Sequence, residues 1–245
     1  MKFQFNTENN VLVSLKKPKS IYGLKLIRKY KSLLVFEIDS VEAYDELRNI
    51  KNAVCYLDKF ILLLPNTYTE QKLIWKNFYR LFGEDYEKYV DKERNLKCIK
   101  AMLQYIVMTK QKNNIFNILD YGCGSGLSLF SGYAGKIIGY EPVKTMKHQA
   151  QKRGMIVCDK YNIKNIPDNH FDAVFSCYVL HMGIDEQDIR RIVPKMKQDA
   201  IWIANFYKNI NEDYVNNLFE KLGFVVNRVV IDDERHGHVY EFRKE

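Results

Sequence analysis

The 245-residue chain is 47% hydrophobic and 13% aromatic, too apolar for a disordered protein, and carries a formal net charge of +8. It has no apolar run near the roughly 18 residues that a membrane-spanning helix needs, and its polar start predicts no secretory signal. The five cysteines are scattered without a Cys-x-x-Cys pair, which is typical of free thiols rather than a disulfide framework or a zinc ribbon. We therefore expect a cytoplasmic protein with no membrane contact and no metal site.

The positive charge belongs to the first 112 residues. Residues 1–65 and 66–112 each contain four more basic than acidic side chains, whereas residues 113–245 contain 17 of each. Residues 9–36 contain seven basic side chains and no acidic one. Such a segment attracts an anionic partner, which could be nucleic acid, a phosphorylated metabolite or an acidic protein. The alternative is a basic hairpin that only water contacts.

Residues 1–65 are predicted to form a small α+β domain. Ser40 is the expected N-terminal cap of a helix at Val41–Ile50. The expected strands are Val11–Leu15, Leu24–Ile27, Leu33–Ile38 and Phe60–Leu64. Residues 66–112 are predicted to form a helical connector or lid, because Ile74, Phe78 and Leu81 recur at helical spacing.

From residue 113 onward, short apolar runs alternate with helical segments. The expected strands are Ile115–Tyr121, Lys136–Tyr140, Met155–Cys158, Phe171–Ser176, Ala200–Phe206, Phe224–Ile231 and His238–Arg243. The expected helices are Leu127–Tyr133, Val143–Arg153, Glu186–Val193 and Glu212–Leu222. Gly154 and Gly223 are expected to end their helices, and Pro194 is expected to end or kink its helix. This alternation predicts an α/β fold, a Rossmann-like and mostly parallel sheet with helices on both faces.

A glycine-rich loop follows the first of these strands. Gly122, Gly124 and Gly126 let the backbone turn tightly and approach a ligand closely. Residue 127 is Leu, so the dinucleotide-binding pattern G-x-G-x-x-G is not met. Glu141 follows the second strand, where a carboxylate can accept both hydroxyls of a ribose. Carboxyl ends of parallel strands meet at one edge of a sheet, so the spacing predicts a single ligand site there.

Residues 115–245 resemble the class I S-adenosylmethionine-dependent methyltransferases. The matching segments are Leu119–Gly126, Gly139–Pro142, Cys158–Asp159 and Phe171–His181. The resemblance implies a seven-stranded sheet whose last strand, His238–Arg243, is antiparallel. It also implies S-adenosylmethionine as the cofactor and S-adenosylhomocysteine as the product. Residues 113–245 are accordingly expected to be the cofactor-binding methyltransferase domain.

The resemblance further implies roles for individual residues at the strand ends. Asp120, Gly122 and Gly124 would hold the methionine part, and Cys123 between the glycines counts among the cofactor-binding residues. Glu141 would bind the ribose, and Pro142 would pack near the adenine. Asp159 would meet the adenine amino group with Lys160 beside it, and Cys177 would lie next to the methionine end.

The end of the fourth strand discriminates between methyl acceptors. Enzymes that methylate exocyclic nitrogens often carry Asn/Asp-Pro-Pro-Tyr/Phe there, whereas this chain has Ser176-Cys-Tyr-Val. Enzymes that methylate carbon 5 of cytosine use a Pro-Cys nucleophile. Cys177 follows Ser instead, which disfavours a covalent thiol mechanism. Tyr178–His181 resembles small-molecule methyltransferases, so His181 is a candidate general base and Tyr178 a candidate catalytic residue. His181 could instead be a polar residue that is satisfied at a helix start.

Three functions remain open from the sequence. The favoured one is methyl transfer to an oxygen or nitrogen atom of a small-molecule metabolite, with Tyr178, Asn205 and Tyr207 lining the pocket. The second is RNA methylation, with the basic N-terminal domain gripping phosphates. The third is a non-catalytic protein that binds the cofactor or a partner. With the first function, the N-terminal domain would shape the pocket or a dimer interface, through which the protein could form an oligomer.

Overall fold

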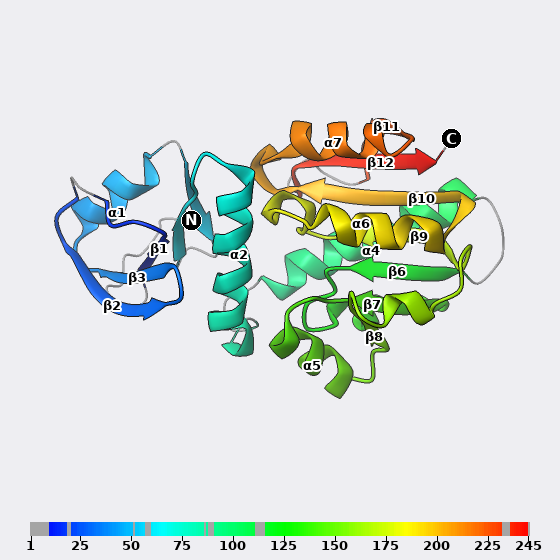
Figure 1. Ribbon diagram of the computed structural model, residues 1–245, viewed down its shortest axis with the longest axis horizontal. Coiled ribbons are helices and arrows are strands. Elements are labelled where there is room, and N and C mark those ends of the chain that lie inside the picture. Colours follow the sequence, from blue (N-terminus) through cyan, green and yellow to red (C-terminus); the bar gives the residue numbers. More distant parts are fainter. Residues whose placement is uncertain are drawn as a thin grey trace. The chain divides into compact units, whose positions relative to one another are not determined.

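The computed structural model describes residues 10–18, 21–50, 52–56, 60–85, 87, 91–110, 116–231 and 236–244 (Figure 1). Lys19 of the basic segment and Ile115, the first residue of an expected strand, lie outside these ranges. The chain divides into two compact units, Met1–Asp91 and Lys92–Glu245. In the part of the chain that the structure describes, no helix has the length and apolar composition of a membrane span.

The first unit contains a five-stranded sheet with the order β2-β3-β1-β5-β4. Its elements are β1 (Val11–Ser14), β2 (Leu24–Tyr30), β3 (Leu33–Ile38), α1 (Val41–Arg48), β4 (Ala53–Tyr56), β5 (Phe60–Leu63) and α2 (Tyr68–Phe82). The predicted α+β fold is confirmed, and the hydroxyl of Ser40 caps α1 by accepting a hydrogen bond from the backbone N–H of Ala43 at 3.1 Å. The four-residue strand β4 was not predicted.

The second unit contains a seven-stranded sheet with the order β11-β12-β10-β9-β6-β7-β8. Its strands are β6 (Asn117–Tyr121), β7 (Lys136–Tyr140), β8 (Val157–Cys158), β9 (Phe171–Ser176), β10 (Met196–Phe206), β11 (Phe224–Val229) and β12 (His238–Lys244). Its α-helices are α4 (Lys92–Lys110), α5 (Lys144–Lys152), α6 (Glu186–Ile192) and α7 (Glu212–Lys221). The predicted Rossmann-like sheet is confirmed.

The strand directions bring the important loops to one edge. Strands β8, β7, β6, β9 and β10 are parallel neighbours. Strand β12 is antiparallel to both β10 and β11, as the resemblance implied, and Figure 1 shows it beside β10. The carboxyl ends of the five parallel strands therefore meet at one edge of the sheet, where ligands bind in open α/β folds.

Helices cover both faces of this sheet. Helix α4 buries Cys98, Met102 and Ile106 against one face, on a cluster that includes Ile118, Phe175 and Ile203 of the strands. On the other face, Phe219 of α7 contacts Trp202 of β10 at 5.1 Å and Phe242 of β12 at 4.0 Å between ring centroids. Burial on both faces explains why the central strands read as continuous apolar runs.

Several boundaries differ from those expected. The predicted helix Leu127–Tyr133 is a single 3-10 turn, η3 (Leu127–Phe130), because it is enclosed by Gly126 and Gly132, whose φ angles are 85° and 79°. Strand β10 begins at Met196, ahead of the predicted start, and β8 is limited to Val157–Cys158. Gly154 and Gly223 follow α5 and α7 with φ angles of 91° and 82°, as helix-ending glycines do.

Candidate functional site

The glycine loop after β6 crosses the carboxyl end of β7. The backbone N–H groups of Gly122 and Cys123 both donate to the carbonyl of Tyr140, at 2.8 and 3.2 Å. Gly122 has a φ of 78°, and a Cβ at this position would come within 2.5 Å of Cγ2 of Val179. Both the backbone conformation and the close approach therefore require glycine at position 122.

Glu141 joins the loop to the next strand. Its Oε2 accepts a hydrogen bond from Gly124 N–H at 3.0 Å, and its Oε1 accepts one from Val143 N–H at 2.8 Å. The side chain is only 5% exposed. Burial raises the pKa of Glu141 to about 7, although the two backbone hydrogen bonds oppose the shift. Each carboxylate oxygen retains a lone pair for a further donor.

Asp120, the fourth residue of β6, is also buried next to the loop. Its Oδ2 accepts a hydrogen bond from the hydroxyl of Ser128 at 2.5 Å. Burial raises the pKa of Asp120 to about 7. The negative charge of Asp120 in turn contributes to the raised pKa of Glu141, so the site holds two buried carboxyl groups that repel each other when both are ionised.

Cys123 points away from the edge of the sheet. Its thiol belongs to a buried cluster with Ala150, Met155 and Val157, and a Cβ on Gly139 would lie 2.5 Å from its sulfur. Burial raises the pKa of Cys123 well above its ordinary value. A cofactor could therefore meet this residue through its backbone, while the thiol packs in the core.

The three residues predicted to lie around the adenine are Asp159, Pro142 and Lys160. Asp159 accepts Lys147 Nζ at 2.6 Å and Tyr161 N–H at 2.9 Å, so both carboxylate oxygens have partners within the chain. Burial alone would raise the pKa of Asp159, but Lys147 and the backbone donors hold it below its usual value. Pro142 and Lys160 are exposed. The adenine-side roles of these three residues stay predictions.

Tyr178 lies just past the carboxyl end of β9 in a left-handed conformation, with a φ of 58°. Asn205 of β10 holds it there, because Asn205 Oδ1 accepts Tyr178 N–H at 2.6 Å while its Nδ2 donates to the carbonyl of His236 at 2.9 Å. The phenol oxygen of Tyr178 is 2.8 Å from Nδ1 of His236. Asn205 thus connects strand β10 to the loop after β9 and to the segment before β12.

Two thiols, those of Cys177 and Cys98, lie close to Tyr178 and His236. Cys177 is half-buried, and its sulfur is 3.9 Å from the carbonyl of Asn95. The pKa of Cys98 on α4 is lowered to about 6, first by a hydrogen bond with Cys177 and, against the effect of burial, by His236 and Arg94. The position of Cys177 next to the methionine end of the cofactor stays a prediction.

His181 is almost completely buried, with 1% of its surface exposed. Its ring lies 6.0 Å from that of Tyr207, and its carbonyl accepts a hydrogen bond from Asn211 at 2.8 Å. Burial lowers the pKa of His181 to about 3, because the imidazolium form loses its hydration. A histidine with such a pKa is a weak proton acceptor near neutral pH.

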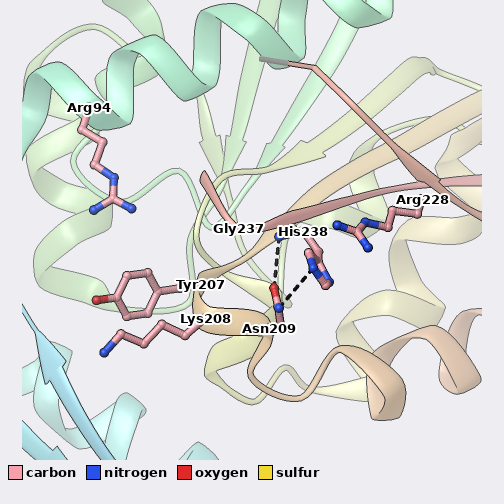
Figure 2. Close-up of a pocket in the computed structure, with 7 residues that line it drawn as sticks. All are labelled: Arg94, Tyr207, Lys208, Asn209, Arg228, Gly237 and His238. Atoms are coloured by element: carbon pink, nitrogen blue, oxygen red, sulfur yellow. Dashed lines mark hydrogen bonds between the residues drawn. The ribbon is translucent and has the colours of Figure 1, made fainter. Parts of the chain in front are cut away.

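A pocket of about 470 Å³ opens at the carboxyl end of β10 (Figure 2). Its lining residues are Arg94, Tyr207, Lys208, Asn209, Arg228, Gly237 and His238. Tyr207 was expected to line a pocket, whereas the three basic side chains were not recognised from the sequence. Among the described residues, no group of three or more His, Cys, Asp or Glu side chains is placed to hold a metal ion.

Comparison with known proteins agrees with this geometry. A family model described as a methyltransferase domain matches residues 118–200, which contain the glycine loop, Glu141 and Tyr178. No curated protein matches the sequence.

Solved structures share the fold. Magnesium protoporphyrin IX methyltransferase of Synechocystis PCC 6803, determined with bound S-adenosylmethionine, aligns with a TM-score of 0.50 at 14% identity over 71% of this chain and 97% of its own. A protein of Methanococcus maripaludis described as an S-adenosyl-L-methionine-dependent methyltransferase aligns with a TM-score of 0.50 at 14% identity, over 74% and 95% of the two chains. At these identities the likeness is one of fold.

The family match identifies a methyltransferase domain in residues 118–200, and the solved structures share the fold of this chain.

Proposed function

We propose that the protein transfers a methyl group from S-adenosylmethionine to an oxygen or nitrogen atom of a small-molecule metabolite. The observation that carries this proposal is the pocket at the carboxyl end of β10, which shares Arg94 and Tyr207 with the surroundings of Tyr178. Its volume of about 470 Å³ is within the usual range for small-molecule sites.

The buried carboxyl groups suit the proposed cofactor. The hydrogen-bond donors to Asp120 and Glu141 are the Ser128 hydroxyl and two backbone N–H groups, all of them neutral. Because burial raises both pKa values to about 7, a ligand with positive charge would stabilise the ionised carboxylates. S-adenosylmethionine carries a sulfonium and an ammonium, and its ribose hydroxyls can donate to the remaining lone pairs of Glu141.

When bound, S-adenosylmethionine supplies a methyl group that is already electrophilic, so the chain must orient the acceptor and take up its proton. We propose that Tyr178 and His236 do so. The acceptor proton passes to the phenol oxygen of Tyr178 while the phenol proton passes to Nδ1 of His236, 2.8 Å away. His181, which burial keeps neutral, is then assigned to packing beside Tyr207 rather than to proton transfer.

The test is a transfer assay on the full chain. Purified protein is incubated with S-adenosylmethionine and panels of hydroxy acids, phenols and amines, and mass spectrometry detects products that have gained one methylene unit together with S-adenosylhomocysteine. Transfer to a member of the panel supports the proposal. Cofactor binding with no transfer to any member of the panel would favour the RNA or the non-catalytic alternative.

RNA methylation stays the second candidate because of one feature of the first unit. Strand β2 is an edge strand, and its interior residues, Lys25, Arg28 and Lys29 among them, are exposed. A basic edge can grip phosphates, although lysines on an edge strand also prevent unwanted strand pairing. Fluorescence anisotropy with a short single-stranded RNA decides between these roles: affinity that falls steeply with salt supports RNA, and absent binding removes this candidate.

A further inference from the structure

The pocket beside β10 is strongly basic. Three of its lining residues, Arg94, Lys208 and Arg228, carry positive charge, and no lining residue is acidic. They come from helix α4, the turn after β10 and strand β11, so the fold brings together side chains that are far apart in the sequence. A concave surface with charge of one sign concentrates ligands of the opposite sign.

Two of these cations share one aromatic ring. The guanidinium carbon of Arg94 is 5.9 Å from the ring centroid of Tyr207, and Nζ of Lys208 is 5.6 Å from the same centroid. Figure 2 shows Tyr207 between the two side chains. The ring attracts each cation, but the two positive charges repel each other. An anion held near both would remove this repulsion.

Two residues that line the pocket have a strained backbone. Lys208 and Asn209 have φ angles of 49° and 58°, a left-handed conformation that non-glycine residues rarely adopt. A Cβ on Gly237 would lie 2.1 Å from the carbonyl oxygen of Phe206, so the two chain segments cross in close contact. Strained conformations of this kind concentrate at ligand-binding sites.

Hydrogen bonds hold the crossing together. Asn209 Oδ1 accepts the backbone N–H of His238 at 3.1 Å, which leaves Asn209 Nδ2 to donate to His238 Nε2 at 3.2 Å (Figure 2). His238 Nδ1 therefore carries the proton and donates to Glu212 at 2.9 Å. The carboxylate of Glu212 is hydrogen-bonded to His238 and is not part of the lining. Its single negative charge offsets at most one of the three positive charges of the lining.

We propose that this pocket is a subsite for an anionic group of the methyl acceptor, a carboxylate or a phosphate monoester. The inference rests on the proposed function, because it assigns the pocket to the acceptor rather than to the cofactor. The guanidinium carbon of Arg94 is 5.6 Å from the ring centroid of Tyr178, so an anion bound at Arg94 places the rest of the acceptor beside Tyr178. The acceptor is then a small metabolic acid or phosphate ester.

The test uses two exposed cations, Lys208 and Arg228. The double variant Lys208→Gln/Arg228→Gln is compared with Lys144→Gln/Lys152→Gln, which removes the same charge from exposed positions of helix α5. Melting temperatures are measured with inorganic phosphate, acetate or chloride at equal ionic strength, and calorimetry measures S-adenosylhomocysteine binding to each protein.

We expect phosphate or acetate to raise the melting temperature of wild type and of the α5 variant above the chloride value, in a saturable way. The pocket variant should lose most of this rise and bind S-adenosylhomocysteine within about twofold of wild type. A larger rise in melting temperature with phosphate than with acetate indicates a phosphate ester, and a larger rise with acetate indicates a carboxylate.

Three outcomes would overturn the proposal. The first is an equal response of both double variants to the anions, and the second is no response of wild type beyond that to chloride. The third is a tenfold or greater loss of S-adenosylhomocysteine affinity in the pocket variant, which would assign the cations to the cofactor's own carboxylate. Anion binding without any S-adenosylhomocysteine binding would leave a genuine anion site and refute the proposed function instead.

Discussion

Oε2 of Glu141 accepts a hydrogen bond from the backbone N–H of Gly124 at 3.0 Å, so one carboxylate ties the end of β7 to the glycine loop after β6. The same carboxylate is the residue proposed to bind the ribose. Loop geometry and the proposed ligand recognition therefore depend on one buried side chain.

The variant Glu141→Gln tests this double role. A glutamine side chain has one acceptor oxygen and one NH₂ group. The NH₂ group would face the N–H of either Gly124 or Val143, so two donors would oppose each other and one hydrogen bond would be lost. We expect S-adenosylhomocysteine to bind at least about tenfold more weakly, a loss of about 1.4 kcal/mol or more, as measured by calorimetry. The matched control is Asp168→Asn, since Asp168 pairs with Lys195 on the surface. Unchanged affinity in Glu141→Gln would contradict the assignment.

The close approach at Gly122 can be separated from its backbone strain. Gly122→Ala introduces a Cβ within 2.5 Å of Val179 at a φ of 78°, whereas Gly154→Ala introduces one at a φ of 91° with nothing within 4 Å. Gly154→Ala should cost about 1 kcal/mol from strain alone, and Gly122→Ala should cost clearly more. Thermal unfolding measures both. Equal losses would show that Val179 moves aside freely.

The buried carboxyl group of Asp120 should make stability depend on pH. Its pKa is about 7 in the folded chain against an ordinary value of 3.8, so the folded state binds this proton more tightly. The resulting stabilisation is complete below about pH 4 and is lost as the pH rises through about 7. Asp120→Asn cannot titrate and should show a smaller fall in the free energy of unfolding between pH 5 and 8. Identical pH profiles for variant and wild type would refute this explanation.

Tyr178 and His181 should respond differently to substitution once an acceptor is known. Tyr178→Phe removes the hydroxyl group that contacts His236, so we expect kcat to fall by about 10²-fold with little change in cofactor affinity. His181→Gln removes a histidine that burial keeps neutral and should lower stability more than kcat. If His181→Gln abolishes turnover in a protein that still folds and binds cofactor, the roles are reversed.

Local sequence patterns predicted most of the fold and part of the candidate site. The glycine loop and Glu141 were predictable because both directly follow strands, and parallel strands bring their carboxyl ends together. The 3-10 turn at Leu127–Phe130 was missed because an apolar run does not reveal how soon flanking glycines stop it.

The basic pocket had no local signal. Arg94 lies close to Tyr207 only because helix α4 packs on one face of the sheet, and Tyr207 directly follows β10. His236 contacts Tyr178 only because the segment before β12 lies beside the loop after β9. Contacts of this kind depend on tertiary packing and have no short sequence pattern. The histidine predicted as the base, His181, follows the carboxyl end of the fourth strand in the sequence, whereas the structure brings His236 to Tyr178.

The central claim is that the edge formed by the glycine loop and Glu141 binds S-adenosylmethionine. Calorimetric titration of the folded 245-residue chain with S-adenosylhomocysteine tests it most directly. We predict one binding site with a dissociation constant on the order of micromolar and a matching rise in melting temperature. A folded sample that shows neither binding heat nor a change in melting temperature would contradict the account.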